Sequence, residues 1–178
     1  MDWNDKVQVR NYHRAYRAKK RIPRLIEADK KRKLLYNSLW NLPPVELAYI
    51  AGLLDGEGCI TIVKGHHRRL HPNWSPEYAL HISISNQFVP ALEYLKSATG
   101  LGSIQRDRGK NFKWLISCQQ AAEFLKVIKP HLLIKAKQAD VAIKFQSLLT
   151  VRYHQPLTNA QKLERANLKL DIMKLNHS

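Results

Sequence analysis

Two acidic residues, Asp55 and Glu57, lie two positions apart and alternate with the glycines Gly56 and Gly58. Glycine permits a tight turn and leaves the neighbouring backbone carbonyls accessible to an ion. Carboxylate and carbonyl oxygens are the ligands that hard divalent ions such as Mg²⁺ or Mn²⁺ prefer. One carboxylate holds such an ion poorly, so a second carboxylate or a substrate phosphate would have to complete a site here.

A short, mostly apolar helix is predicted immediately before this acidic turn, over residues 45–54. Within it Ala48 and Gly52 lie four residues apart, which places both small residues on one face. Small residues at this spacing let a second helix approach backbone to backbone. Two copies meeting at a twofold axis would therefore bring two acidic turns together. Taken alone, the residues leave an ordinary helix–turn–strand with an acidic turn as an equal alternative.

The chain is strongly basic: its 178 residues include 30 Lys and Arg against 14 Asp and Glu, a formal charge of +16. Twelve of the cations and only four of the acids fall within residues 1–33. Such a chain most often binds a polyanion, with nucleic acid first and an anionic membrane surface a distant second. We expect residues 1–44 to form a basic N-terminal extension that contacts DNA phosphates. A solvated arm or a localisation signal is the plainer alternative.

Several other classes of protein are excluded by composition. With 44% hydrophobic residues the chain can bury a core. Its two cysteines, Cys59 and Cys118, do not form a disulfide framework, which favours a reducing compartment. No apolar stretch approaches the ~20 residues of a membrane span, and no secretory signal is recognisable. We therefore expect a protein that is intracellular and not secreted, in the cytoplasm or nucleoid or in an organelle of the encoding genome, without a membrane partner.

Hydrophobic periodicity from residue 45 onward predicts an α+β domain over 45–150 with the order αββαββα. In residues 78–85, Leu80, Ile82 and Ile84 alternate with polar residues, as in a strand with one core face. A four-stranded antiparallel sheet with helices on its other face is expected, with strands over 60–64, 78–85, 102–106 and 113–118. Residues 151–178 are expected to form a C-terminal helix that opens on the capping box Thr158-x-x-Gln161.

The stretch Ile50 to Gly58 resembles the LAGLIDADG motif of homing endonucleases. The letters that match are Ala51, Gly52, Leu53, Asp55 and Gly58, and Glu57 replaces the final Asp conservatively. A later segment, Pro130 to Ala139, is similar to the family's late signature of a proline, apolar residues and K-x-K-Q-A. Together the resemblance covers about residues 45–150 and implies the family's αββαββα fold.

Because only one motif is present, the resemblance implies a homodimer. Its interface is expected at the motif helix, from Ala48, Ala51, Gly52 and Asp55. The resemblance implies that the Glu57 side chain and the Gly56 carbonyl ligate the metal, while Lys135 supports the transition-state charge. Asp55 is expected to orient the helix end or touch the partner chain rather than to ligate. At the end of the second strand, parity favours Asn86 and residue type favours Gln87 as the residue facing the catalytic solvent network.

DNA specificity would come from the polar face of the sheet, laid along the major groove. Strand parity places on that face Thr61, Val63, His81, Ser83, Ser85, Gln105 and Lys113. Further DNA contacts are expected from basic residues outside that face: Arg68, Arg69, Arg106, Arg108 and Lys137. The two arginines around the hairpin turn are expected to contact phosphates, unless a bulge turns Arg106 into the groove.

The sequence thus predicts an intron-encoded, site-specific homing endonuclease. It would cut both strands of a long pseudo-palindromic DNA target by metal-dependent phosphodiester hydrolysis, with Mg²⁺ or Mn²⁺. An RNA-splicing maturase that binds its own intron RNA, or a non-cleaving nucleic-acid-binding protein of the same fold, is the alternative. A basic structural RNA-binding protein ranks last, because it gives no reason for the acidic turn beside a close-packing helix.

Overall fold

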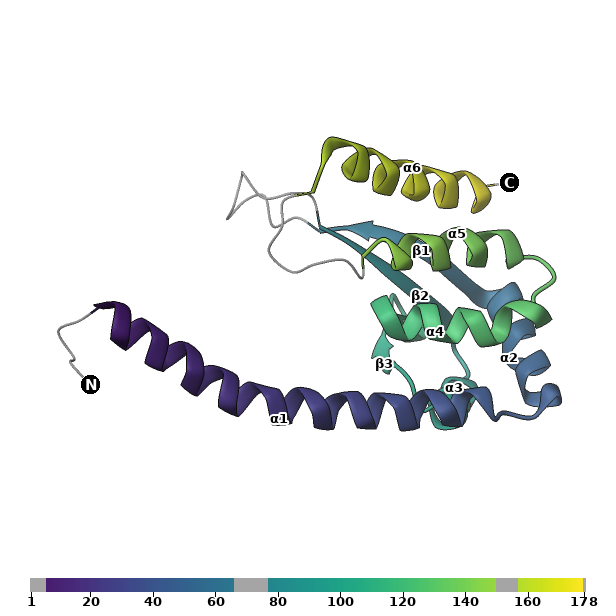
Figure 1. Ribbon diagram of the computed structural model, residues 1–178. Coiled ribbons are helices and arrows are strands. Elements are labelled where there is room, and N and C mark those ends of the chain that lie inside the picture. The colour runs from purple at the N-terminus through teal and green to yellow at the C-terminus, as the bar shows by residue number, and fades with distance from the viewer. Residues whose placement is uncertain (1–5, 66–76, 150–156, 178) are drawn as a thin grey trace. The chain divides into compact units, whose positions relative to one another are not determined.

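The computed structural model describes residues 6–65, 77–149 and 157–177 (Figure 1). The chain divides into two compact units, residues 1–38 and 39–178. The first consists of helix α1 (Lys6–Trp40), which runs for 35 residues through an internal proline and whose last two residues lie in the second unit. Pro23 lacks the N–H that would bond to the carbonyl four residues earlier. The extension expected over residues 1–44 is therefore mostly one helix.

The second unit is a mixed helix and strand domain whose order confirms the expected αββαββα pattern. Its elements are α2 (Pro44–Glu57), β1 (Gly58–Lys64), β2 (Tyr78–Asn86), α3 (Val89–Thr99), β3 (Ser103–Arg106), β4 (Phe112–Ser117), α4 (Cys118–Ile128), the 3-10 turn η2 (Lys129–His131), α5 (Ala136–Ser147) and α6 (Asn159–Leu175). All strand pairs are antiparallel, in the order β1-β2-β4-β3. The fold class is α+β, as predicted.

The two faces of the sheet follow the period of two in its strands. Residues paired directly across two neighbouring strands point to the same face of the sheet. The strand register therefore shows which alternate residues of all four strands lie on one face. One face is the core, and its buried members are Ile60, Ile62, Leu80, Ile82, Ile84, Trp114 and Ile116. The opposite face keeps partial or full exposure, and it is the face on which DNA contacts were predicted.

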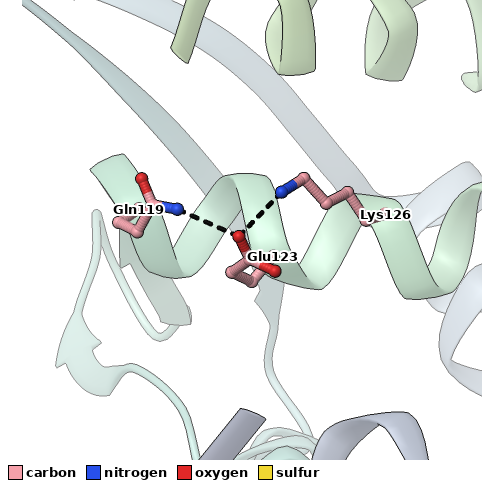
Figure 2. Close-up of polar contacts among 3 residues, drawn as sticks. All are labelled: Gln119, Glu123 and Lys126. Carbon is pink, nitrogen blue, oxygen red and sulfur yellow. Dashed lines mark hydrogen bonds and ion pairs between the residues drawn. The ribbon is translucent and has the colours of Figure 1, made fainter. Parts of the chain in front are cut away.

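The helices cover the core face. Helix α4 contacts β2 and β4, while α5 and α6 contact β1 (Figure 1). The amphipathic pattern of α4 explains its position: Phe124, Leu125 and Ile128 are fully buried. Its polar side carries a short network in which Gln119 Nε2 and Lys126 Nζ both donate to Glu123 Oε1, at 2.9 and 2.8 Å (Figure 2). Pairs three and four residues apart of this kind stabilise a helix modestly.

The C-terminal helix α6 belongs to the second unit. Its predicted capping box is confirmed, since Thr158 Oγ1 accepts from Gln161 N–H and Gln161 Oε1 accepts from Thr158 N–H. Asn176 Nδ2 donates to the Ile60 carbonyl and Gln138 Nε2 donates to the Leu175 carbonyl, which ties the helix end to β1 and α5. Among the residues that the structure describes, no helix is long and apolar enough to cross a membrane.

One boundary differs from the sequence expectation at the place where chemistry was predicted. The helix expected to end near Leu54 continues to Glu57, and β1 begins at once with Gly58. The glycines suggested a turn, but packing of α2 outweighs their low helix propensity. Asp55, Gly56 and Glu57 are therefore the last helical turn, and their side chains and carbonyls follow helix geometry.

Candidate active site and nucleic-acid interface

The acidic end of α2 is open to solvent. Glu57 and Gly56 are both exposed, and a side chain built on Gly56 would meet nothing within 4 Å. Gly58 is different, because a Cβ there would lie 2.5 Å from the Leu54 carbonyl oxygen. Its N–H donates to that same carbonyl and ends the helix. Gly58 thus permits the close passage from helix to strand that presents Glu57 at the surface.

Asp55, two residues earlier, has its carboxylate directed at a distant loop. Oδ2 accepts hydrogen bonds from the backbone N–H groups of Leu133 (2.8 Å) and Ile134 (3.2 Å), and Oδ1 accepts from that of Lys135 (2.9 Å). Desolvation raises the pKa of Asp55, but the three hydrogen bonds and the charge of Lys135 together outweigh it, so the pKa lies below 3.8. Asp55 is an ionised clamp on the loop before α5.

Lys135 reaches the end of α2 through the same contact. Its Nζ donates to the Asp55 carbonyl oxygen, which is one of the last carbonyls of the helix. A cation there also compensates the negative end of the helix dipole. Residues 80 positions apart in the chain are thereby held together. Glu57 and Lys135, the predicted metal ligand and the predicted transition-state cation, therefore lie at the same end of α2, where β1 begins.

Cys59 follows immediately on β1 and is exposed on the polar face of the sheet. Partial burial raises the pKa of its thiol, and the nearby positive charge of Lys135 partly opposes that shift.

This combination of a motif helix, a clamped lysine and a four-stranded sheet can be compared with known proteins. The family profile described as LAGLIDADG endonuclease matches residues 50–148, more than half of the chain. The chain belongs to the LAGLIDADG endonuclease family. The match spans a single copy of the motif, at residues 50–58.

Solved structures of LAGLIDADG proteins share the fold. The homing endonuclease I-CvuI, in complex with its target in the presence of calcium, superposes with a TM-score of 0.62 at 16% identity, over 74% of this chain and 82% of that one. The archaeal intron-encoded homing endonuclease I-Vdi141I, complexed with DNA, gives 0.63 at 18% identity, over 74% and 84%. I-SmaMI, bound to uncleaved DNA with calcium, gives 0.55 at 23% identity, over 72% and 45%. Comparison with curated protein sequences finds no match.

The end of α2 fits a hard divalent ion only in part. An exposed carboxylate and a nearby backbone carbonyl at the negative end of a helix are suitable oxygen donors. Within the described ranges, however, no group of three or more His, Cys, Asp or Glu residues is arranged to hold a metal. If a metal binds here, one chain would supply only part of its ligand set, and a substrate phosphate or a second chain would complete it.

The predicted dimer residues separate into two groups. Ala48 and Gly52 are exposed on α2, and a Cβ built on Gly52 meets nothing within 4 Å. Ala51 lies on the other side of α2 and is fully buried inside its own chain, so its side chain is not available to a partner. The burial of Ala51 does not favour a contact with a partner, and its assignment to the interface stays a prediction. Asp55 is engaged within its own chain, by the loop before α5.

The predicted DNA face is assembled by the register of the sheet. Thr61 is paired with His81, and Ser85 and Gln105 both pair with Lys113. Val63 and Ser83 share this parity, and all seven residues are at least partly exposed. Burial lowers the pKa of His81 from its ordinary value, which favours the neutral ring. A neutral ring can donate to or accept from a base edge, whereas it attracts phosphate weakly.

Asp107 is a residue on this side of the sheet that the sequence reasoning missed. Its Oδ1 lies 3.5 Å from Lys113 Nζ, and its Oδ2 accepts from Ser85 Oγ at 3.4 Å. Desolvation raises its pKa, but hydrogen bonds and the Lys113 charge outweigh that influence and lower it. From its place in the hairpin turn, Asp107 was expected to be only a turn residue. The register of β3 and β4 is what brings its carboxylate close to Lys113.

The other predicted contacts are more scattered. Arg106 and Arg108 are exposed around the hairpin turn, with Arg106 on the core parity opposite Phe112. Asn86 Oδ1 accepts from the Phe88 N–H in the turn after β2, while Gln87 is exposed. Lys137 is exposed on the first turn of α5. Arg68 and Arg69 lie outside the described residues. The roles assigned to these side chains stay predictions.

Proposed function

We propose that this LAGLIDADG protein is a homodimeric, divalent-metal-dependent endonuclease that cuts both strands of a specific DNA site. The observation that carries the proposal is the end of α2, where exposed Glu57 lies two residues from the carbonyl that Lys135 contacts. An acid and a cation at the same solvent-facing helix end suit phosphodiester hydrolysis. The proposed homing role, an intron location of the gene and binding of intron RNA rest on the family resemblance alone.

The residues of this chain would divide the chemistry among them. The Glu57 carboxylate and the Gly56 carbonyl would hold an Mg²⁺ or Mn²⁺ ion, with DNA phosphate oxygens as further ligands. When bound, the ion would lower the pKa of a coordinated water and stabilise charge on the phosphate. Lys135, fixed by Asp55, would stabilise the negative charge that develops as water attacks phosphorus and the bond to the 3′ oxygen breaks.

A second copy of the chain is the partner that α2 fits. The helix is apolar on the side away from its own core, where Val45 is 81% exposed and Ala48 and Gly52 leave room for close approach. Leu133 and Ile134, whose backbones bond to Asp55, are 92% and 70% exposed nearby. Large apolar side chains exposed together mark an interaction surface. Two motif helices crossing here would place two Glu57 residues near one axis, one for each DNA strand.

The polar face of the sheet would read the DNA. Its partly exposed Thr, Ser, His, Gln and Lys side chains offer donors and acceptors of the kind that contact base edges in the major groove. A twofold dimer presents two such faces, so a near-palindromic target is expected.

The test is cleavage of a DNA library by the purified protein with Mg²⁺, with Glu57→Gln and a chelator as two controls. Glu164→Gln, an acid-to-amide change on α6, is the matched variant that should cut normally. Double-strand cuts at a near-palindromic site, lost in both controls, support the proposal. Site-specific binding without any cutting would instead favour the maturase or binding-protein alternative. Cutting that survives Glu57→Gln would show that the active site is elsewhere.

A further inference from the structure

Helix α1 carries a row of arginines whose spacing matches its own period. Arg10, Arg14, Arg17, Arg21 and Arg24 follow one another at intervals of four, three, four and three residues. At about 100° per residue these positions fall within a band about 80° wide, and they extend along about 21 Å of the helix. We call these five positions the arginine stripe. The sequence pattern alone did not reveal it, because a stripe exists only if the segment is one continuous helix.

The positive charge of the stripe is not balanced by acids of the same segment. No Asp or Glu occurs from Lys6 to Ile26. The two acids of α1 lie further along, and each has a lysine one turn away: Glu27 with Lys31 at 3.9 Å and Asp29 with Lys33 at 3.1 Å. Both acids of α1, together with their lysine partners, therefore lie C-terminal to the arginine stripe.

The chemistry of the stripe excludes two kinds of partner. A coiled-coil partner bound at the stripe would require apolar residues at alternating intervals of three and four, and at the stripe those positions are arginine; the apolar row Ala15, Ala18, Ile22 and Leu25 lies beside it. A membrane-surface helix requires an apolar face opposite its cations. The opposite side of α1 instead mixes Gln8, Lys19, Lys30 and Lys33 with Tyr12 and Ile26, so it is not an apolar face. A polyanion with regularly repeated charges is the partner that the stripe itself fits.

We propose that α1 is a second DNA-binding surface, which binds the phosphate backbone of duplex DNA through the arginine stripe. Guanidinium groups pair with phosphates in two-point geometry, and charges recurring about every 5 Å along a rod suit a strand of closely spaced phosphates. The surface adds affinity without sequence preference. The choice of duplex DNA rests on the proposed function, whereas the phosphate contact does not.

The experiment measures binding of the full-length protein to a non-target DNA duplex over a series of salt concentrations, with chelator present. The stripe variant is R10Q/R14Q, and the matched control is K19Q/K30Q on the opposite side of α1. Each removes two positive charges from the chain, and glutamine is a helix former comparable to both residues. Circular dichroism of both variants checks that α1 keeps its helix.

We expect the slope of log affinity against log salt to flatten by about 1.8 in the stripe variant, since each lost phosphate contact removes about 0.9. The control should change it by less than about 0.5. Equal changes in the two variants, or none in either, would overturn the stripe as the binding surface. Stripe-dependent binding to an RNA hairpin but not to the duplex would overturn DNA as the partner. Because no cleavage is measured, failure of the proposed nuclease activity leaves this result unaffected.

Discussion

The Asp55 carboxylate connects α2 to a loop 78–80 residues further along the chain, through hydrogen bonds from three successive backbone N–H groups. A carboxylate that accepts several N–H bonds is held ionised and in one orientation. The backbone that it fixes is the backbone that starts α5 with Lys135. In the proposed mechanism Asp55 would therefore act through the position of Lys135, since its carboxylate is already engaged by the loop.

Asp55→Asn should weaken both the fold and the activity. The amide has one acceptor oxygen and no charge, so at least one of the loop N–H groups loses its partner. We expect a loss of about 1–2 kcal/mol in unfolding free energy and a lower cleavage rate with DNA affinity nearly unchanged. Urea denaturation and single-turnover cleavage measure the two effects. Asp140→Asn, which removes an exposed ion pair with Lys129, is the control and should cost less than about 1 kcal/mol.

Asp55 should also make the stability of the protein depend on pH in a defined direction. Folding lowers the pKa of Asp55 below 3.8, so the unfolded chain binds more protons between the two values. The stabilisation is fully present above the unfolded pKa and is lost as pH falls through the folded one. The stability difference between wild type and Asp55→Asn should be constant from about pH 5 to 7 and shrink below about pH 4. A difference that persists unchanged in acid would contradict the clamp.

Two glycines of the motif, Gly52 within α2 and Gly58 directly after it, are expected to respond in opposite ways to alanine. Gly58→Ala places a methyl group 2.5 Å from a backbone oxygen, so we expect a loss of about 1–3 kcal/mol. Gly52→Ala meets open space in the single chain and should stabilise the helix by about 0.5–1 kcal/mol. Denaturation at low protein concentration measures both.

Gly52→Ala should at the same time weaken self-association, because the added methyl lies on the proposed contact side of α2. Sedimentation over a concentration series measures the dimer constant. A variant that is more stable yet dimerises as tightly as wild type would place the interface on another surface.

At the sheet, Asp107 restrains Lys113 on the proposed DNA face. Asp107→Asn should raise affinity for non-target DNA and steepen its salt dependence by about 0.9, because one cation becomes free to contact phosphate. Discrimination between target and non-target DNA should fall. Glu123→Gln on α4 is the matched control, since it also removes one acid and frees one lysine, but on a helix (Figure 2). Equal effects of the two variants would mean that net charge alone matters.

For the molecule as a whole, the metal site proposed for each chain leads to a prediction about stoichiometry. If each chain of a dimer cuts one strand, a mixed dimer of wild type and Glu57→Gln should nick its target without breaking it. We expect nicked circles to accumulate when the two proteins are co-purified as mixed dimers carrying different tags. Gel electrophoresis of supercoiled target plasmid separates nicked from linear product. Linear product at the wild-type rate would show that one active site cuts both strands.

Local sequence determined much of this protein. The alternation of Leu80, Ile82 and Ile84, the capping box at Thr158 and the motif around Glu57 each depend on neighbours within a few residues. Helix and strand periods, turn residues and caps are local properties, so they were predictable. The αββαββα order and the core face of the sheet followed from them.

Tertiary structure alone decided the rest. The burial of Ala51, the clamp of Asp55 on the 133–135 loop and the pairing of Asp107 with Lys113 depend on how elements pack and on the strand register. The arginine stripe is a different case, because it required only that residues 10–24 be one continuous helix, through Pro23 where local propensity predicts a break. Long-range contacts of this kind join segments whose local sequences do not indicate that they will meet. Which residues become partners depends on how the elements pack, and not on the residues next to them in the sequence.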